Sequence, residues 1–321
     1  MKILLISVLV LVSREDEFDK INLDIKWKQH KFTYSLKFDE KEEAIRKNIF
    51  IENSRFIEEH NAKNSELKLK MNQFGHLRTE EVLMNKVLKN KKFTKSHSER
   101  SGGDLPVKTS IDWRTFKVVS PIKNQLNCGS CYAFSGIGAI ESQYAIHKGR
   151  LPLLSEQEIV DCSHDYGNDG CHGGLPIFVY NFAKDNGLVN QSFYPYVGEE
   201  DDCRLSKPIA DYRVKSYVEI TEGDEKQLIR AISFKGPVSI GIDANFREFM
   251  FYHTGIINST ECSSVRLNHG VLAVGYDLTS QSHYYIVKNS WGTDWGEDGY
   301  FRILLGKNMC GVATLATYPL I

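Results

Sequence analysis

The chain has 321 residues, of which 41% are hydrophobic and 25% charged, the ordinary composition of a globular protein with a sizeable core. This composition excludes a disordered or fibrous chain, and the length allows one large domain or two or three small ones. The net charge of −1 conceals an asymmetry: residues 1–103 carry 21 Lys and Arg against 16 Asp and Glu, and residues 104–321 carry 19 against 25. The first part is thus basic and the second acidic, which favours electrostatic attraction between them. The alternative is that the two charged surfaces are solvated independently.

A short apolar segment opens the chain. Lys2 is followed by an unbroken run of apolar and small residues at positions 3–12. The run is too short to span a bilayer and has the form of a secretory signal peptide, with cleavage expected after Ser13. No later segment reaches transmembrane length, so we expect a protein without a membrane span that enters the oxidising secretory pathway.

Residues 25–62 are predicted to form a charged helix. Within them six residues recur at intervals of four, four, three, four and four: Glu42, Arg46, Phe50, Asn53, Ile57 and Asn61. This spacing keeps all six on one stripe of a helix, although a charged stripe is usually only a solvated face. Residues 85–103 are rich in Lys, Ser, Asn and Gly and predict an exposed linker, where proteolytic cuts concentrate.

The stretch 125–135 reads QLNCGSCYAFS and leads into a dense run of apolar and small residues. That run predicts a helix buried on nearly all sides, which ends near Lys148 with Gly149 as the C′ residue. Ser130 is the expected N-cap and places Cys131 in the first turn. Backbone N–H groups and the helix dipole favour an anion there, so the thiol becomes a nucleophilic thiolate more readily. The alternative is a small core residue or half of a disulfide.

The cysteine count bears on this choice. The seven cysteines are Cys128, Cys131, Cys162, Cys171, Cys203, Cys262 and Cys310. An odd number in an exported protein leaves at least one thiol outside a disulfide. Cys128 and Cys131 also have the spacing of a redox pair or half a zinc site, but no second close pair of Cys or His completes a metal site. Three disulfides and one reactive thiol are the simplest count, and we expect no metal or other cofactor.

The rest of the chain divides into a helical and a strand-rich part. Helices and Gly-rich loops are predicted to about Val214, and strands from Tyr217 onward, at residues 238–242, 270–276 and 284–288. Two further motifs accompany these strands, Asn268-His269-Gly270 and Lys288-Asn289-Ser290-Trp291-Gly292. The order of the elements predicts an α+β fold.

The three motifs together resemble those of the papain-like cysteine proteases, closest to the cathepsin L branch, with His269 and Asn289 lying 138 and 158 residues beyond Cys131. The resemblance covers the chain after about the first twenty residues. It implies a papain-like two-lobed fold, with a helical left lobe and a β-barrel-like right lobe, and an α-helical inhibitory propeptide. The charged stripe matches the Glu-Arg-Phe-Asn-Ile-Asn pattern of such propeptides. The implied domains are a signal peptide (1–13), a propeptide (14–103) and a protease domain (104–321), with activation cleavage between Ser98 and Leu105.

The resemblance also implies the activity, that of a cysteine endopeptidase made as an inactive zymogen. Cys131 supplies the thiolate, His269 the imidazolium, Asn289 orients His269, and Gln125 helps to hold the oxyanion. The implied substrate-binding residues are Gly173, Gly174, Leu175, Pro176, Gly241, Leu267, Gly270, Trp291 and Leu315. A catalytically silent papain-like binding or storage protein is the alternative, and the presence of all four catalytic residues disfavours it.

Further expectations come from the same resemblance. Because sequence alone cannot choose among fifteen connectivities, the pairing Cys128–Cys171, Cys162–Cys203 and Cys262–Cys310 is the one that the family implies. Asn190 and Asn258 head glycosylation motifs. The implied partners are protein and peptide substrates, the propeptide itself and cystatin-type inhibitors, with no nucleic acid. We expect a monomer, located in the lysosome or in an extracellular or digestive lumen.

The chain departs from the family pattern at several positions. A Gly-x-Asn-x-Phe-x-Asp strand of the propeptide is expected at residues 70–76, where Lys70 and His76 replace the Gly and the Asp. If His76 lies among apolar groups or beside a cation, its protonation destabilises the propeptide; if it faces a carboxylate of the enzyme, protonation tightens the complex. Neighbouring Lys70 and Arg78 favour the first outcome. Leu315 stands where cathepsin L has a smaller residue, which predicts a shallow substrate pocket.

Overall fold

The computed structural model describes residues 21–63, 66–83, 106–205 and 211–321. The expected signal peptide, the linker and the activation site between Ser98 and Leu105 lie outside these residues. The described residues form two compact units, the first within 21–63 and 69–82, and the second within 66–68, 83, 106–205 and 211–321. None of the helices in the described residues is long and apolar enough to cross a membrane.

The first unit is helical. Residues 21–33 form one helix, and α2 (Glu40–Ala62) and α3 (Thr79–Val82) follow, with the short β1 (Lys68–Leu69) at the sequence boundary of the units. The prediction that residues 25–62 are helical is therefore wrong only at residues 34–39. Ser35 has a left-handed φ of 54°, and Asp39 caps α2 by accepting hydrogen bonds from the N–H groups of Lys41 and Glu42.

The six-residue stripe of α2 is not a solvated face. Arg46 forms an ion pair with Glu81, at 2.6 Å, and the Asn53 amide donates to the carbonyl oxygens of Gly75 and Leu77, both at 3.0 Å. Asn61 bonds the backbone N–H and carbonyl of Leu69 through its side-chain amide, while Phe50 and Ile57 are buried. The stripe thus holds the segment 69–81 against α2 within this unit.

The strand expected at residues 70–76 is absent. The segment turns instead, because Asn72 accepts a hydrogen bond from the N–H of Phe74 through its side-chain oxygen and from the N–H of Gly75 through its carbonyl oxygen. An Asn side chain that bonds the backbone two residues on favours a turn over an extended strand.

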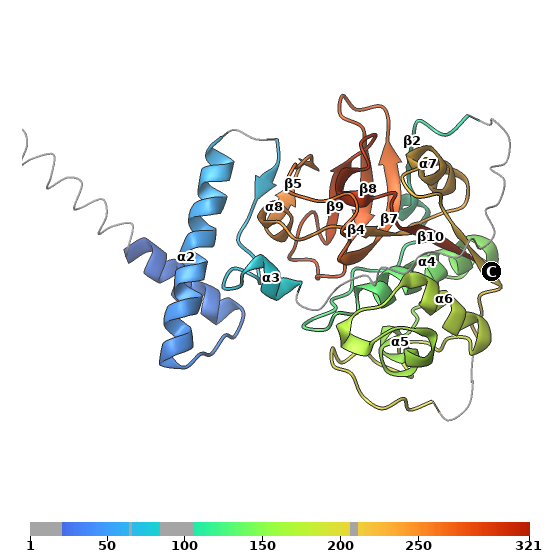
Figure 1. Ribbon diagram of the computed structural model, residues 1–321, viewed down its shortest axis with the longest axis horizontal. Helices are drawn as coiled ribbons and strands as arrows, with labels where there is room; N and C mark the ends of the chain where they lie inside the picture. Colours follow the sequence, from blue (N-terminus) through green and yellow to red (C-terminus); the bar gives the residue numbers. More distant parts are fainter. Residues whose placement is uncertain (1–20, 64–65, 84–105, 206–210) are drawn as a thin grey trace, which may run out of the picture. The chain divides into compact units, whose positions relative to one another are not determined.

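The second unit has a helical part and a sheet, which Figure 1 shows side by side. Its main helices are α4 (Cys131–Lys148), α5 (Glu156–Cys162) and α6 (Pro176–Asp185), and its short 3₁₀ turns here are η1 (Trp113–Phe116), η2 (His164–Tyr166) and η3 (Gly170–His172). The predicted buried helix is confirmed, since every residue of α4 from Cys131 to Tyr144 is buried and the helix ends at Gly149, with φ 68°. One core cluster joins α4 and α6 to the strand β7.

An eight-stranded sheet lies within the described part of this unit, in the order β3-β10-β4-β7-β8-β9-β6, with β2 paired to β7. Its strands are β2 (Ser110–Asp112), β3 (Ser216–Glu219), β4 (Val238–Ile242), β6 (Ile256–Ile257), β7 (His269–Asp277), β8 (Tyr284–Lys288), β9 (Tyr300–Leu304) and β10 (Ala316–Leu320). The pairs are antiparallel except β6 with β9. The three strands predicted at 238–242, 270–276 and 284–288 are confirmed.

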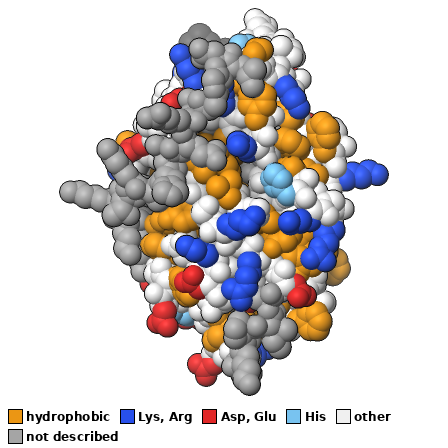
Figure 2. All heavy atoms as spheres, turned by 90° about the vertical axis from the view of Figure 1, so that its right-hand side faces the viewer, with side chains coloured by type: hydrophobic (Ala, Val, Ile, Leu, Met, Phe, Trp, Pro, Cys, Tyr) orange, Lys and Arg blue, Asp and Glu red, His pale blue; other side chains and the backbone are white. Residues whose placement is uncertain are grey.

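Three helical segments and one short strand complete the strand-rich part: α7 (Glu225–Phe234), α8 (Arg247–Met250), η4 (Met309–Gly311) and β5 (Tyr252–Thr254). Figure 2 shows one face of the molecule, on which Lys and Arg side chains lie among exposed hydrophobic ones. The acidic excess of residues 104–321 is therefore not gathered on the described part of that face.

Candidate active site

The first turn of α4 touches the start of β7. Cys131 is the first residue of α4 and 1% exposed, and His269 is the first residue of β7 and fully buried. Between them, a Cβ atom at Gly270 would lie 3.2 Å from the carbonyl oxygen of Cys131, a tight contact that explains the glycine. The helix and the strand therefore bring Cys131 and the residue next to His269, more than 130 positions apart in sequence, into backbone contact.

Asn289 fixes the orientation of the imidazole. His269 Nε2 lies 2.8 Å from Asn289 Oδ1, and an amide oxygen only accepts, so Nε2 carries the proton. The N–H of Ser290 donates to the same oxygen at 2.8 Å and holds the amide in place. The other ring nitrogen, Nδ1, is then the one that can exchange a proton with a thiol.

An aromatic cluster packs against His269 beside its bond to Asn289. The Trp291 ring stacks on the imidazole with centroids 4.9 Å apart, and Phe249 meets Trp291 edge-on at 5.3 Å. Trp295 packs on both Trp291 and Phe249 and is fully buried. Phe249, on α8, belongs to this cluster, although no local motif in the sequence separates it from other core aromatics.

Gln125 is held at both ends of its side chain. Its Nε2 donates to the carbonyl of Cys128 at 2.8 Å, and its Oε1 accepts from the hydroxyl of Ser290 at 2.6 Å. The backbone N–H of Gln125 also donates to the carbonyl of Ser290, at 2.8 Å. One N–H of the amide is thereby used, and a primary amide has a second that can bond an oxyanion.

Ser130 occupies the N-cap of α4 as expected, but its side chain makes no capping hydrogen bond. The hydroxyl lies instead 2.7 Å from the phenol oxygen of Tyr196. The Ser130 side chain thus does not cap the first turn of α4, where an oxyanion would bind by the proposed chemistry.

The expected substrate-binding residues form an apolar wall beside this site. Leu175 and Leu315 belong to one buried cluster, against which the partly buried Leu267 packs. Gly241 donates its N–H to the carbonyl of Leu315 at 2.8 Å and pairs with Gly270, which contacts Cys131. The wall is thereby connected to the thiol. Gly173 and Gly174 form the loop that enters α6, whose first residue is Pro176.

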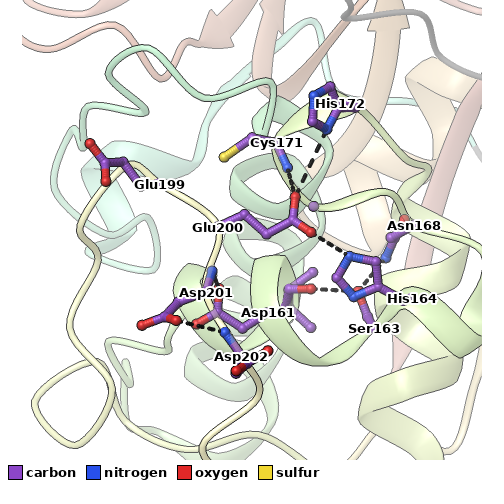
Figure 3. A network of polar contacts seen from close by, with 12 residues as sticks. Asp161, Ser163, His164, Asn168, Cys171, His172, Glu199, Glu200, Asp201 and Asp202 are labelled. Atoms are coloured by element: carbon purple, nitrogen blue, oxygen red, sulfur yellow. Dashed lines mark hydrogen bonds and ion pairs between the residues drawn. The ribbon is translucent and has the colours of Figure 1, made fainter.

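The carboxylate of Glu200 braces that loop (Figure 3). It accepts from the backbone N–H of Cys171 at 3.0 Å and lies 2.9 Å from His164 Nε2 and 3.9 Å from His172 Nδ1. Gly170 has a left-handed φ of 50°, which favours glycine, and a Cβ atom there would lie 1.7 Å from the carboxylate and displace it. No local pattern in the sequence distinguishes Glu200 within the acidic run 199–202, so this contact was not expected.

The three disulfides join Cys128 to Cys171, Cys162 to Cys203 and Cys262 to Cys310, the pairing that the resemblance implied. Cys131 takes no part in them. Among the described residues, no cluster of three or more His, Cys, Asp or Glu has the arrangement of a metal site. Of the two glycosylation motifs, Asn258 is exposed, while Asn190 is half-buried and its Oδ1 accepts from the N–H of Ser192.

The chain is similar to known proteins over most of its length. Residues 107–320 match the papain family cysteine protease model, and residues 27–82 match the cathepsin propeptide inhibitor domain (I29). The chain is 40% identical to cathepsin L2 of Homo sapiens over 320 residues, 96% of each chain, and 41% identical to digestive cysteine proteinase 3 of Homarus americanus over 303 residues, 91% of this chain and 94% of that one.

Among solved structures, digestive procathepsin L 3 of the Tenebrio molitor larval midgut superposes with a TM-score of 0.85 at 38% identity, over 93% of this chain and 99% of that one. The chain therefore belongs to the papain family of cysteine proteases. It is a cathepsin L-like member that carries its own propeptide inhibitor domain, the form of a zymogen.

Proposed function

We propose that the protein is an endopeptidase that cleaves protein and peptide substrates through a thiolate at Cys131. The observation that carries this proposal is the meeting of α4 and β7, where the Gly270 contact sets Cys131 beside a His269 whose Nε2 is bonded to Asn289 at 2.8 Å. A nucleophile, a base and a group that orients the base are the parts that covalent peptide hydrolysis needs.

The roles of the residues follow from their positions. The helix N-terminus and the imidazolium of His269 stabilise the Cys131 thiolate, whose sulfur bonds to the scissile carbonyl carbon. The Cys131 N–H and the second N–H of Gln125 donate to the resulting oxyanion. When the carbon–nitrogen bond breaks, His269 gives its proton to the leaving amine and a thioester remains. Water then attacks the thioester, gives a proton to His269, and releases the acid and the thiolate.

The remaining assignments belong to the same proposal. The segment 14–103 acts as the inhibitory propeptide, and removal of the signal peptide and of this segment leaves a monomeric enzyme. A secretory route agrees with three disulfides, which persist in oxidising compartments, and leads to the lysosome or to an extracellular or digestive lumen. Cystatin-type inhibitors are the expected protein partners, besides substrates.

A thiol-directed epoxide probe and a blocked peptide test the proposal. After acidification the wild type should incorporate one probe per chain and cleave a quenched peptide that is blocked at both termini, as only an endopeptidase does. Cys131→Ala should do neither, with a loss of activity of about 10⁴-fold or more, yet it should be secreted as a disulfide-bonded zymogen. Normal turnover by Cys131→Ala, or cleavage only of peptides with an open terminus, would contradict the proposal.

A further inference from the structure

The phenol of Tyr196 connects two parts of the candidate active site. Its hydroxyl donates to the backbone carbonyl of Gln125 at 2.7 Å and lies 2.7 Å from the hydroxyl of Ser130. A carbonyl only accepts and a phenol has one proton, so the Ser130 hydroxyl is the donor in the second bond. Tyr196 thus links Gln125 to the residue that precedes Cys131.

The loop between these two residues depends on such contacts. Leu126 has a left-handed φ of 52° and is 56% exposed, with its side chain against Gly198. A residue other than glycine keeps this conformation only where the surroundings hold it. Within the loop, the carbonyl of Gln125 otherwise accepts only a long bond, 3.4 Å, from the N–H of Cys128.

The Tyr196 ring is itself fixed to the nucleophile helix. It meets the ring of Phe134, in the first turn of α4, edge-on, with centroids 4.9 Å apart at an interplanar angle of 81°. Burial raises the pKa of Tyr196, so at acidic and neutral pH the phenol keeps its proton and can donate a hydrogen bond.

We propose that Tyr196 is a positioning residue for oxyanion stabilisation: its hydroxyl sets the spacing between Gln125 and the first turn of α4, so that their N–H groups converge on one oxygen. The inference rests on the proposed function of Gln125 and Cys131. It gives a role in the reaction to a residue that touches neither the substrate nor the reacting atoms.

Tyr196→Phe removes the hydroxyl and keeps the ring against Phe134. We expect kcat for a peptide amide to fall about tenfold, a part of the roughly 10² to 10³ that loss of a whole oxyanion donor costs, with KM changed less than twofold. Alkylation of Cys131 by iodoacetamide forms no oxyanion, so its rate should stay at the wild-type value. Binding of a peptide aldehyde, whose thiol adduct carries the oxyanion, should weaken in parallel with kcat.

Tyr144→Phe is the matched control. Tyr144 lies near the end of α4, and its hydroxyl also makes two backbone bonds, to the carbonyl and the N–H of Arg213 at 2.9 and 2.7 Å. Loss of that hydroxyl should leave kcat, alkylation and aldehyde binding unchanged. If Tyr196→Phe does not accumulate as a folded protein, the same comparison is made in a Leu126→Gly background, because glycine accepts the left-handed turn without support.

A double-mutant cycle with Gln125→Ala separates the outcomes. If Tyr196 acts through Gln125, Tyr196→Phe should cost little once Gln125 is replaced. The inference is overturned if Tyr196→Phe lowers kcat equally with and without Gln125. It is also overturned if Tyr196→Phe keeps the wild-type kcat, or if its alkylation rate falls in parallel with kcat. These outcomes would leave the proposed function standing, which fails only if Cys131→Ala keeps its activity.

Discussion

His30 and His76 lie side by side inside the first unit, with Nε2 of the first imidazole 3.3 Å from Nδ1 of the second. Both rings are buried, and four aromatic side chains pack around them: Trp27, Tyr34, Phe38 and Phe50. A hydrogen bond between imidazoles needs a donor and an acceptor, so two imidazolium rings cannot share it.

The surroundings of the pair disfavour protonation. Burial and then the neighbouring imidazole lower the pKa of His30 to about 4. Burial and then the Arg46 guanidinium lower the pKa of His76 to about 4, against the opposite effect of Glu81 and Glu42. The sequence left two environments open for His76, and the structure shows the first: the ring lies among apolar groups and beside a cation. That cation is Arg46, whereas the sequence had suggested Lys70 or Arg78.

This pair predicts an acid-sensitive propeptide. An unfolded imidazole titrates near pH 6.5. Both imidazoles have lower pKa values in the folded unit than in the unfolded chain, so protons bind the unfolded state more tightly. The free energy of unfolding of the first unit should therefore fall as the pH drops from about 6.5 towards 4. His76→Asn should therefore shift the pH midpoint of self-processing down by about one unit. His60→Asn on α2 is the control, and equal midpoints for all three proteins would contradict the prediction.

The apolar wall predicts substrate preference. Leu175, Leu267 and Leu315 carry no charge, so an Arg at the second residue before the scissile bond would be buried without a partner. We expect Leu and Val to be preferred there over Phe, and Arg to be worst. Leu315→Ala should deepen the pocket and raise kcat/KM for Phe relative to Leu by about tenfold, whereas Leu304→Ala on β9 should not. Arg accepted as well as Leu by the wild type would refute this account of the pocket.

The hydrogen bonds of the Glu200 carboxylate predict an effect on substrate binding. Its carboxylate bonds the N–H of Cys171 and His164 next to the loop of Gly173 and Gly174. Glu200→Gln keeps the shape but loses the charge, so the loop should loosen and KM rise about three- to tenfold, with kcat within twofold. Glu199→Gln, the neighbouring change in the same acidic run, should leave both constants unaltered. A fall in kcat at unchanged KM would show that Glu200 acts on the chemistry instead.

A buried ion cluster predicts a large effect on stability. Lys123 Nζ lies 3.0 Å from Glu141 and 2.6 Å from Glu156, and both carboxylates are almost fully buried. Lys123→Met leaves them without their cation and should lower the free energy of unfolding by about 3 to 5 kcal/mol. Arg114→Met, which breaks the more exposed pair with Asp112, should cost about 1 kcal/mol or less. Thermal unfolding in a Cys131→Ala background avoids self-digestion, and similar losses in the two variants would contradict the prediction.

Local patterns in the sequence determined much of this protein. The apolar run after Ser130 gave a buried α4 that ends at Gly149, and the spacing of three and four residues in α2 gave a stripe that faces its own unit. Helices and strands have fixed periods, so such patterns show which residues share a face. The family motifs likewise pointed to Cys131, His269, Asn289 and Gln125. In the second unit His269 bonds Asn289, Gln125 bonds the neighbouring Ser290, and Gly270 contacts Cys131.

Only the tertiary structure decided which distant groups meet. Tyr196 bonds Gln125 across 71 residues, His30 meets His76 across 46, and Glu200 reaches Cys171 across 29. No periodicity of the sequence predicts such pairs, because they form where separate elements pack. In the sequence, each of these residues looks like an ordinary aromatic residue, histidine or surface carboxylate. Ser130 also shows this dependence on packing. Its position in the sequence predicted a helix cap, but its hydroxyl bonds Tyr196, which packing places within hydrogen-bonding distance.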